Sequence, residues 1–292
     1  MPAVDLPLGP IDYRVFGPDS PDAPTAVFVH GFLVNGTLWD PVAELLASAG
    51  VRSIVPDWPL GAHRTPAAPD AALSPTAVGQ AVLDLLEALA LDDVTLVGND
   101  TGGAICQLAL KGDDHRIGGL VLTNCDAFEN FPPAFFVPLF KLARHRTAVW
   151  AILQTTRARL LRHSPLAFGP LLRGPRSATL TRGWVQPALS DPRIRGDITR
   201  FARGVERREL LDAASWLSHF DRPTRLVWGK RDRWFTLATA QRLAGAFPRA
   251  TLVEVEDATT FISIDQPGAV ANAIIEITAE LHRSRQSIRR SD

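Results

Sequence analysis

Residues 97–103 (VGNDTGG) place a single carboxylate between small residues. Asp100 lies two residues after Gly98 and two before Gly102, in the form Gly-x-Asp-x-Gly. A nucleophile at a strand-to-helix turn has strained backbone geometry, and small residues flank it because the strand and helix backbones pass closely. The helix that begins there also directs its positive end toward the side chain. The pattern predicts Asp100 as a reactive group, with an ordinary helix N-cap as the alternative.

Strands and helices that could position this turn alternate along the chain. Apolar runs rich in β-branched and aromatic residues predict buried strands, at residues 25–30, 51–55, 94–98, 119–123, 224–228 and 251–255. Helical spacing predicts helices between most of them, at residues 38–49, 74–89, 102–109, 237–246 and 269–281. Such alternation favours a parallel sheet with helices on both faces, so we expect an α/β fold.

The alternation stops after Asn124. Residues 128–216 contain helical stretches at 149–161 and 198–212 but no clear buried strand. The charge changes as well: residues 1–100 hold 3 basic and 13 acidic side chains, and residues 141–208 hold 15 basic and 3 acidic ones. Charge asymmetry of this kind indicates separate structural units. We expect a core formed by residues 1–127 and 217–292, interrupted by a helical cap at 128–216.

The composition excludes several classes of protein. Of the 292 residues, 46% are apolar and 21% are charged, which is typical of a globular domain. No apolar run approaches the roughly 20 residues that a membrane span needs, and no signal peptide pattern begins the chain. The 31 basic and 31 acidic residues give no net charge, which argues against nucleic acid as a partner. Two cysteines, expected as free thiols, predict a cytoplasmic location.

Further motifs accompany the Asp100 turn: His30-Gly31-Phe32 directly after a predicted strand, and WGKRD at residues 228–232 after another. With the helical insertion, they make the chain resemble the α/β-hydrolase fold. The resemblance is to the aspartate-nucleophile branch, which includes haloalkane dehalogenases and epoxide hydrolases. It covers nearly the whole chain and implies a mostly parallel central sheet, helices on both faces and a helical cap. It also implies an enzyme that needs no cofactor and no metal.

The resemblance assigns roles to particular residues. Asp100 would be the nucleophile, and Asp232 the acid that orients a catalytic histidine, although Asp232 as a turn residue is the alternative. Backbone N–H groups at Phe32 and Thr101 would form an oxyanion hole, and the loss of one such donor typically costs about 10²–10³ in rate. We expect His30 to support its loop.

The histidine that the resemblance calls for is missing. The chain reads DATTFISIDQP at residues 257–267, and Thr260 stands where the histidine is expected. No histidine lies between His219 and His282. A general base contributes roughly 10²–10⁴ in rate, and threonine has no pKa suited to the task. The catalytic triad is therefore expected to be incomplete.

Two residues are candidates to replace the missing base. His63 follows the predicted strand at 51–55 and would face the site from its loop, with a surface histidine as the alternative. Asp257 is the second candidate. A mechanism without a base is the third interpretation.

Other departures concern the substrate. Dehalogenases of the branch usually have a tryptophan after the nucleophile and an asparagine after His-Gly, where this chain has Thr101 and Phe32. Epoxide hydrolases usually use two cap tyrosines, and Tyr13 is the only tyrosine of the chain. Neither standard reaction is therefore expected to apply unchanged.

Several side chains are candidates to contact the substrate. We expect Asn124, Trp184 and Thr260 to do so, with packing in the core as the alternative for Trp184. Asn124 and Asp126 end a predicted strand at the rim of the site, which suits either a polar contact to substrate or a plain strand-end turn. Cap aromatic residues are expected to line a cavity for a hydrophobic small molecule.

Three hypotheses about function follow. The first is a hydrolase of the epoxide hydrolase or dehalogenase type, with Asp100 as the nucleophile and a hydrophobic small molecule as the substrate. The second is a lyase, isomerase or cyclase in which Asp100 moves a proton, and the third is a ligand-binding relative without catalysis. Nucleic acid and membrane partners are not expected, and a homodimer is compatible with the sequence.

Overall fold

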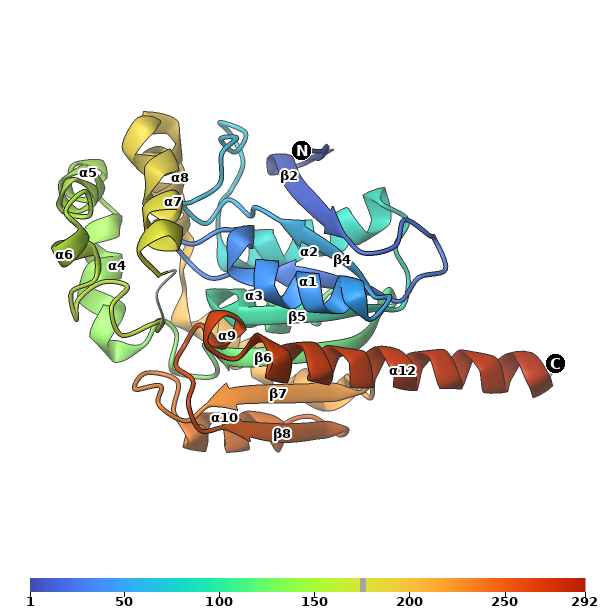
Figure 1. Cartoon of the computed structure of the whole chain (residues 1–292). Helices are drawn as coiled ribbons and strands as arrows, with labels where there is room; N and C mark the ends of the chain where they lie inside the picture. Colours follow the sequence, from blue (N-terminus) through green and yellow to red (C-terminus); the bar gives the residue numbers. More distant parts are fainter. Residues whose placement is uncertain (174–176, 292) are drawn as a thin grey trace.

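An eight-stranded sheet forms the centre of the molecule (Figure 1). The computed structural model describes residues 1–173 and 177–291. The strands follow the spatial order β1-β2-β4-β3-β5-β6-β7-β8, with the bounds β1 (Ala3–Leu6), β2 (Gly9–Phe16), β3 (Thr25–Val29), β4 (Arg52–Pro56), β5 (Val94–Asp100), β6 (Ile117–Cys125), β7 (Thr224–Gly229) and β8 (Ala250–Val255). β3 to β8 pair in parallel, so the six predicted strands are confirmed.

The sequence did not predict the first two strands. β1 pairs antiparallel with β2, and β2 pairs antiparallel with β4. Most residues of both strands are only partly buried or exposed, unlike the continuously buried β3 and β6. A half-buried antiparallel edge produces a weak apolar pattern, because only one face must be apolar.

Helices cover both faces of the sheet. In Figure 1, α1 (Asp40–Ser48) and α12 (Pro267–Ser291) lie in front of it, and α2 (Pro75–Ala88), α3 (Thr101–Ala109) and α10 (Leu237–Ala244) lie behind. Short helices η1 (Gly36–Trp39) and α11 (Ile262–Asp265) lie next to α1. Each face has its own cluster of buried apolar side chains, and burial of this surface holds the helices to the sheet.

The remaining helices come between β6 and β7. They are η2 (Ala134–Phe136), α4 (Val137–Ala143), α5 (Arg146–Thr155), α6 (Arg159–Arg162), α7 (Ser177–Ser190), α8 (Pro192–Gly204), α9 (Arg207–Ala214) and η3 (Leu217–His219). Figure 1 shows α4 to α8 beyond one end of the strands, where they pack on one another. α9 instead packs on α3. The domain boundaries at 127 and 216 stay a prediction.

The helices predicted at 149–161 and 198–212 are each interrupted. α5 ends at Thr155 before α6 begins, and α8 ends at Gly204 before α9. Gly204 lies so close to another loop that an added Cβ would be 2.5 Å from the carbonyl oxygen of Leu73. Val205 then takes an extended conformation, which ends the helix.

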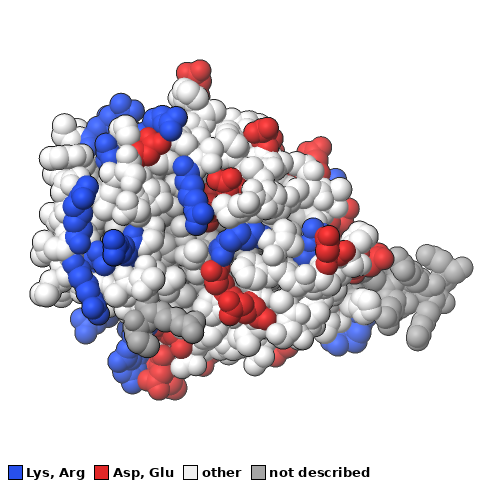
Figure 2. All heavy atoms as spheres, turned by 45° about the horizontal axis from the view of Figure 1, so that its top comes forward, with Lys and Arg blue, Asp and Glu red and all other residues white. Residues whose placement is uncertain are grey.

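The surface charge of the cap differs from that of the core. Most basic residues between 141 and 208 that the structure describes are exposed. Figure 2 shows many of the Lys and Arg side chains on the side of the molecule that carries the cap. Among the described residues, no helix is both long and apolar enough to cross a bilayer.

The topology brings four loops together. β5 lies between β3 and β6, and β7 follows β6. Because the carboxyl ends of parallel strands meet at one edge, the segments after β3, β5, β6 and β7 converge there, beneath the cap. These segments carry Phe32, Asp100, Asp126 and Asp232.

Candidate active site

Asp100 occupies a strained turn between β5 and α3. Its backbone has φ 54° and ψ −132°, a conformation that costs a non-glycine residue about 1–3 kcal/mol. The neighbouring glycines are required by close packing: an added Cβ on Gly102 would lie 2.3 Å from the carbonyl oxygen of Val29, and one on Gly98 would lie 2.7 Å from the Cys106 sulfur. The turn has the predicted geometry. The alternative of an N-cap is wrong, because the Asp100 side chain makes no capping hydrogen bond.

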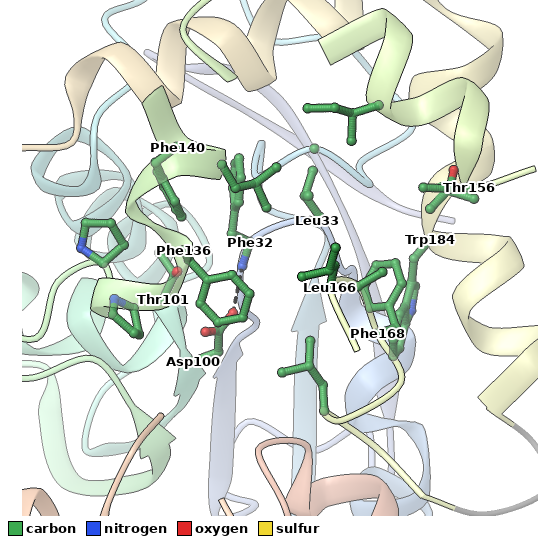
Figure 3. Close-up of a pocket in the computed structure, with 18 of the residues that line it drawn as sticks. Phe32, Leu33, Asp100, Thr101, Phe136, Phe140, Thr156, Leu166, Phe168 and Trp184 are labelled. Carbon is green, nitrogen blue, oxygen red and sulfur yellow. Dashed lines mark hydrogen bonds between the residues drawn. The ribbon is translucent and has the colours of Figure 1, made fainter. Parts of the chain in front are cut away.

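Two backbone N–H groups point at the Asp100 carboxylate. The N–H of Phe32 donates to Oδ2 at 3.2 Å (Figure 3), and the N–H of Thr101 also favours the ionised carboxylate, although its geometry falls short of a hydrogen bond. Burial raises the pKa of Asp100 to about 7. The two N–H groups oppose this rise, and the negative charge of Asp232 adds to it. One carboxylate oxygen is thus held by the main chain, in a site that disfavours its charge.

A second carboxyl group lies beside the first. Asp126 follows β6 and is 1% exposed, and its N–H donates to the backbone oxygen of Asp100 at 3.4 Å. Burial and then the charge of Asp100 raise the pKa of Asp126 well above its ordinary value, while the Thr101 hydroxyl opposes the rise. Its Oδ1 has no hydrogen-bond partner among the described residues.

Asp100 and Asp126 are both among the residues that line a cavity of about 140 Å³. Its walls are mostly apolar and include Phe32, Leu33, Phe136, Phe140, Phe168 and Trp184. Figure 3 shows Phe136 beside the Asp100 carboxylate, with Thr156 and Trp184 on the opposite side of the cavity. The described residues that line it include no histidine, lysine or arginine. The cavity therefore suits a hydrophobic molecule whose reacting atom meets the carboxyl groups.

Asp232 is fixed by local hydrogen bonds. Its Oδ1 accepts from the N–H groups of Trp234 at 2.8 Å and Phe235 at 3.1 Å, and its Oδ2 accepts from Asn124 Nδ2 at 3.1 Å. Burial raises the pKa of Asp232, and these bonds oppose the rise. It does not line the cavity. Its catalytic role stays a prediction, and its contacts are those of a loop-stabilising residue.

Thr260 and Asn124 are not among the residues that line the cavity. Asn124 exchanges hydrogen bonds with the backbone of Gly229, at 3.1 Å and 2.7 Å, and so connects β6 to β7. Thr260 is fully buried, and its carbonyl accepts from Asn99 Nδ2 at 2.8 Å. The Thr260 hydroxyl opposes the rise in the pKa of Asp232, but its geometry falls short of a hydrogen bond. Neither residue reaches the cavity, so we do not carry forward their predicted substrate contacts.

Trp184 lines the cavity with its ring only. Its indole N–H donates to Thr37 Oγ1 at 2.8 Å, so this group is already engaged. Among the other cap aromatic residues, Phe136, Phe140 and Phe168 line the cavity, whereas Phe135 and Trp150 are exposed.

The two candidate replacement bases lie off the cavity. His63 is buried, and its Nδ1 accepts from the N–H of Gly61 at 3.2 Å while its Nε2 contacts Asp197 Oδ2 at 3.0 Å. With both ring nitrogens engaged, His63 has none free to take a proton from water, which disfavours the predicted role. Asp257 is exposed and pairs with Arg231 at 2.7 Å. His30 is buried, accepts from the N–H of Trp58 at 2.8 Å and has its pKa lowered to about 3 by burial, as expected of a residue that supports its loop.

Sequence patterns did not predict that Asp126 lies beside Asp100. Its place at the end of a predicted strand suggests either a rim residue that contacts substrate or a plain strand-end turn, and Asp100 is 26 positions away along the chain. One signal was present: Asp126 follows the end of β6, the strand next to the one that carries Asp100. Adjacent parallel strands bring such positions together.

Comparison of the chain with known protein families agrees with the geometry of this site. A family model described as alpha/beta hydrolase fold matches residues 24–267. The chain belongs to this family. The expected fold class is thereby confirmed, and the family includes hydrolases with named activities among the relatives of this chain.

Two curated relatives match part of the chain. One is an epoxide hydrolase of Caballeronia sordidicola, 38% identical over 80 residues, or 27% of this chain and 24% of the relative. The other is a protein of Variovorax paradoxus (strain S110) provisionally named carbamate hydrolase RutD, 34% identical over 116 residues, or 39% of this chain and 42% of the relative. The chain thus spans less than half the length of the curated relatives it matches.

A solved structure agrees over almost the full length. It is described as a provisional ancestral haloalkane dehalogenase, AncHLD2 (node 2), with a TM-score of 0.76 and 19% identity, over 97% of this chain and 100% of that one. At this identity the likeness shows the shared fold and nothing about the reaction.

Proposed function

We propose that this protein is a hydrolase that acts on a hydrophobic small molecule, with Asp100 as the nucleophile. The observation that supports this most directly is the Asp100 carboxylate itself. It stands on a strained turn, borders an apolar cavity and has one oxygen held by the main chain. Strain of this kind is concentrated at functional sites.

The hydrogen bonds give the two carboxylate oxygens of Asp100 different roles. Oδ2 is engaged by the N–H of Phe32, which leaves Oδ1 to attack an electrophilic carbon. The attack forms an ester between Asp100 and the substrate. When water later adds to the carbonyl carbon of that ester, negative charge develops on Oδ2, where the N–H groups of Phe32 and Thr101 stabilise it.

The relatives suggest the class of substrate. An epoxide hydrolase and a haloalkane dehalogenase are among the proteins that this chain resembles. Both names describe substrates with an electrophilic carbon. A small apolar epoxide or alkyl halide fits a cavity of about 140 Å³ whose lining is mostly apolar and includes Asp100.

Proton transfer is the second candidate function. It is favoured by the pKa of Asp100, about 7, which is close to the optimum for an acid or base at neutral pH. It is also favoured because no histidine lines the cavity among the described residues. In a lyase, isomerase or cyclase, Asp100 would accept and return a proton without forming an ester.

Mass measurements after an acid quench test the proposal. The protein is incubated with a terminal alkyl bromide or a terminal epoxide, quenched and digested. We expect a mass increase equal to the alkyl group or the intact epoxide, on the peptide that contains Asp100, because a nucleophilic carboxylate is retained as its ester. Asp100→Asn is the matched control and should show no adduct. Wild type that converts these electrophiles without any adduct on Asp100 would contradict the nucleophile role and favour proton transfer.

A further inference from the structure

The proposed function leaves Asp126 without a role, although it lines the same cavity as the nucleophile. Gln107 Nε2 donates to the backbone oxygen of Asp126 at 2.8 Å, and the N–H of Asp126 donates to the backbone of Asp100. The main chain of Asp126 is thus fixed beside the nucleophile, and the residue lines the cavity.

Two other buried aspartates show how a structural carboxylate is satisfied in this protein. Asp197 contacts His63, Arg200 and the N–H of Ala67, at 3.0, 2.6 and 3.0 Å. Asp232 accepts three hydrogen bonds from its own loop and Asn124. Asp126 differs from both, because its Oδ1 has no partner among the described residues. An unpartnered buried polar atom is costly unless a substrate or water completes it.

The surroundings of Asp126 keep a proton on it. The ionisable groups that face it are Asp100, Asp232 and the buried thiol of Cys125, and the Thr101 hydroxyl contacts its carboxylate. No lysine or arginine lines the cavity among the described residues. Two adjacent carboxyl groups without a cation cannot both ionise readily. The pKa values of both groups are raised, so one of the two keeps its proton. The N–H of Phe32 stabilises the ionised form of Asp100, so we assign the proton to Asp126.

We propose that Asp126 is the general acid and base of this reaction, beside the nucleophile Asp100. The proposal rests on the proposed function, because it needs an ester on Asp100. It supplies the proton donor that the missing cap tyrosines would provide and the base that the missing histidine would provide.

The same proton of Asp126 is used in both half-reactions and is restored at the end. In the first, Oδ1 of Asp100 attacks a carbon of the epoxide, the carbon–oxygen bond breaks, and the released oxygen takes the proton of Asp126. In the second, the Asp126 carboxylate takes a proton from water as the hydroxide oxygen bonds to Cγ of Asp100. The ester bond then breaks, the departing alkoxide takes that proton back from Asp126, and Asp100 is left as a carboxylic acid. Transfer of this proton to the Asp126 carboxylate restores the starting state.

An alkyl bromide separates the two roles, because bromide leaves with its electron pair and needs no proton. Formation of the ester from a bromide is then independent of Asp126. Its hydrolysis still needs the Asp126 carboxylate, which forms by loss of the proton to solvent once the neutral ester removes the charge on Asp100.

Rapid-quench mass measurements on Asp126→Asn test this division. With a terminal bromide, we expect the ester on Asp100 to form within threefold of the wild-type rate and to persist at least about 10² times longer, the scale of a lost general base. With a terminal epoxide, we expect ester formation to slow by at least about 10². A purely structural role for Asp126 would slow both first steps equally.

Wild type gives a second test that needs no variant. Ester formation from the bromide should rise through about pH 7 and then stay level, because only Asp100 must ionise. With the epoxide it should rise and then fall at higher pH, as Asp126 loses its proton. Equal ester lifetimes in both proteins, or identical pH profiles for both substrates, would overturn the role of Asp126 and leave Asp100 as the nucleophile. No ester on Asp100 in either protein would instead overturn the proposed function.

Discussion

Asp100→Asn is expected to abolish turnover while leaving the protein at least as stable as wild type at pH 7. The amide cannot attack carbon and cannot carry the charge that the Phe32 and Thr101 N–H groups stabilise. Loss of a nucleophile typically costs on the order of 10⁴–10⁶ in kcat. Asparagine also tolerates a positive φ better than most residues, so the turn itself is retained.

The difference in free energy of unfolding between Asp100→Asn and wild type depends on pH. The pKa of Asp100 is raised from 3.8 to about 7 in the folded protein, so folding favours its protonated form. Its contribution to the free energy of unfolding is complete below pH 4 and is lost as the pH rises toward 7. Asparagine does not titrate. The variant should therefore gain stability relative to wild type between pH 4 and 7, by roughly 2–4 kcal/mol given that Asp100 is partly accessible from the cavity.

Denaturant unfolding at several pH values, together with turnover, checks both effects. Asp257→Asn is the matched control, because this exposed aspartate lies outside the cavity and should change neither quantity appreciably. Asp100→Ala is a second variant that cannot be hydrolysed back to aspartate. Turnover within tenfold of wild type in Asp100→Ala would contradict any chemical role for Asp100.

Gly31→Ala is expected to reduce turnover by about 10²–10³, the scale of a lost oxyanion-hole donor. A Cβ on Gly31 would lie within 2.1 Å of Asp100 Oδ2. The carboxylate must move to avoid it, which breaks the 3.2 Å hydrogen bond from the N–H of Phe32. The added Cβ would also lie 2.7 Å from Asp100 Cβ, which cannot rotate away, so the strained turn must shift as well. We therefore expect the overpacking to cost at least about 1–3 kcal/mol of stability.

Alanine substitutions at two other glycines serve as comparisons for Gly31→Ala. Gly268→Ala is the neutral control, because an added Cβ there meets nothing within 4 Å. Gly102→Ala should instead unfold the protein, since its Cβ would meet the rigid backbone oxygens of Val29 and His30. Turnover and thermal unfolding of the three variants separate these outcomes. An unchanged rate in Gly31→Ala would show that the observed position of Oδ2 is unimportant for the reaction.

The parts of the fold that depend on local patterns could be predicted from the sequence. β3 to β7 are mostly buried on both faces, so each reads as a short apolar run, and the glycines around Asp100 reveal a close approach of strand and helix. β8 is a partly exposed edge strand, and its run at 251–255 was still apolar enough to be predicted. β1 and β2 leave many residues partly exposed and gave no such run.

Contacts between distant residues explain why the sequence could not show the surroundings of His63 and Trp184. His63 pairs with Asp197, 134 positions away, and the indole of Trp184 pairs with Thr37, 147 positions away. No pattern of spacing reveals that these polar groups are already satisfied. Asp126 is the opposite case: its position suits an ordinary strand-end residue, and only the structure shows that its Oδ1 lacks a hydrogen-bond partner among the described residues.

The origin of the product oxygen tests most directly whether Asp100 is the nucleophile. The protein in excess converts an epoxide in water enriched in ¹⁸O, so that each molecule turns over once. The diol and the peptide containing Asp100 are then weighed. Because the substrate carbon bonds to a carboxylate oxygen and water adds to Cγ, we expect an unlabelled diol and one ¹⁸O in the Asp100 peptide. A labelled diol with an unlabelled peptide would mean that water attacks the substrate directly, and Asp100 would then be a base.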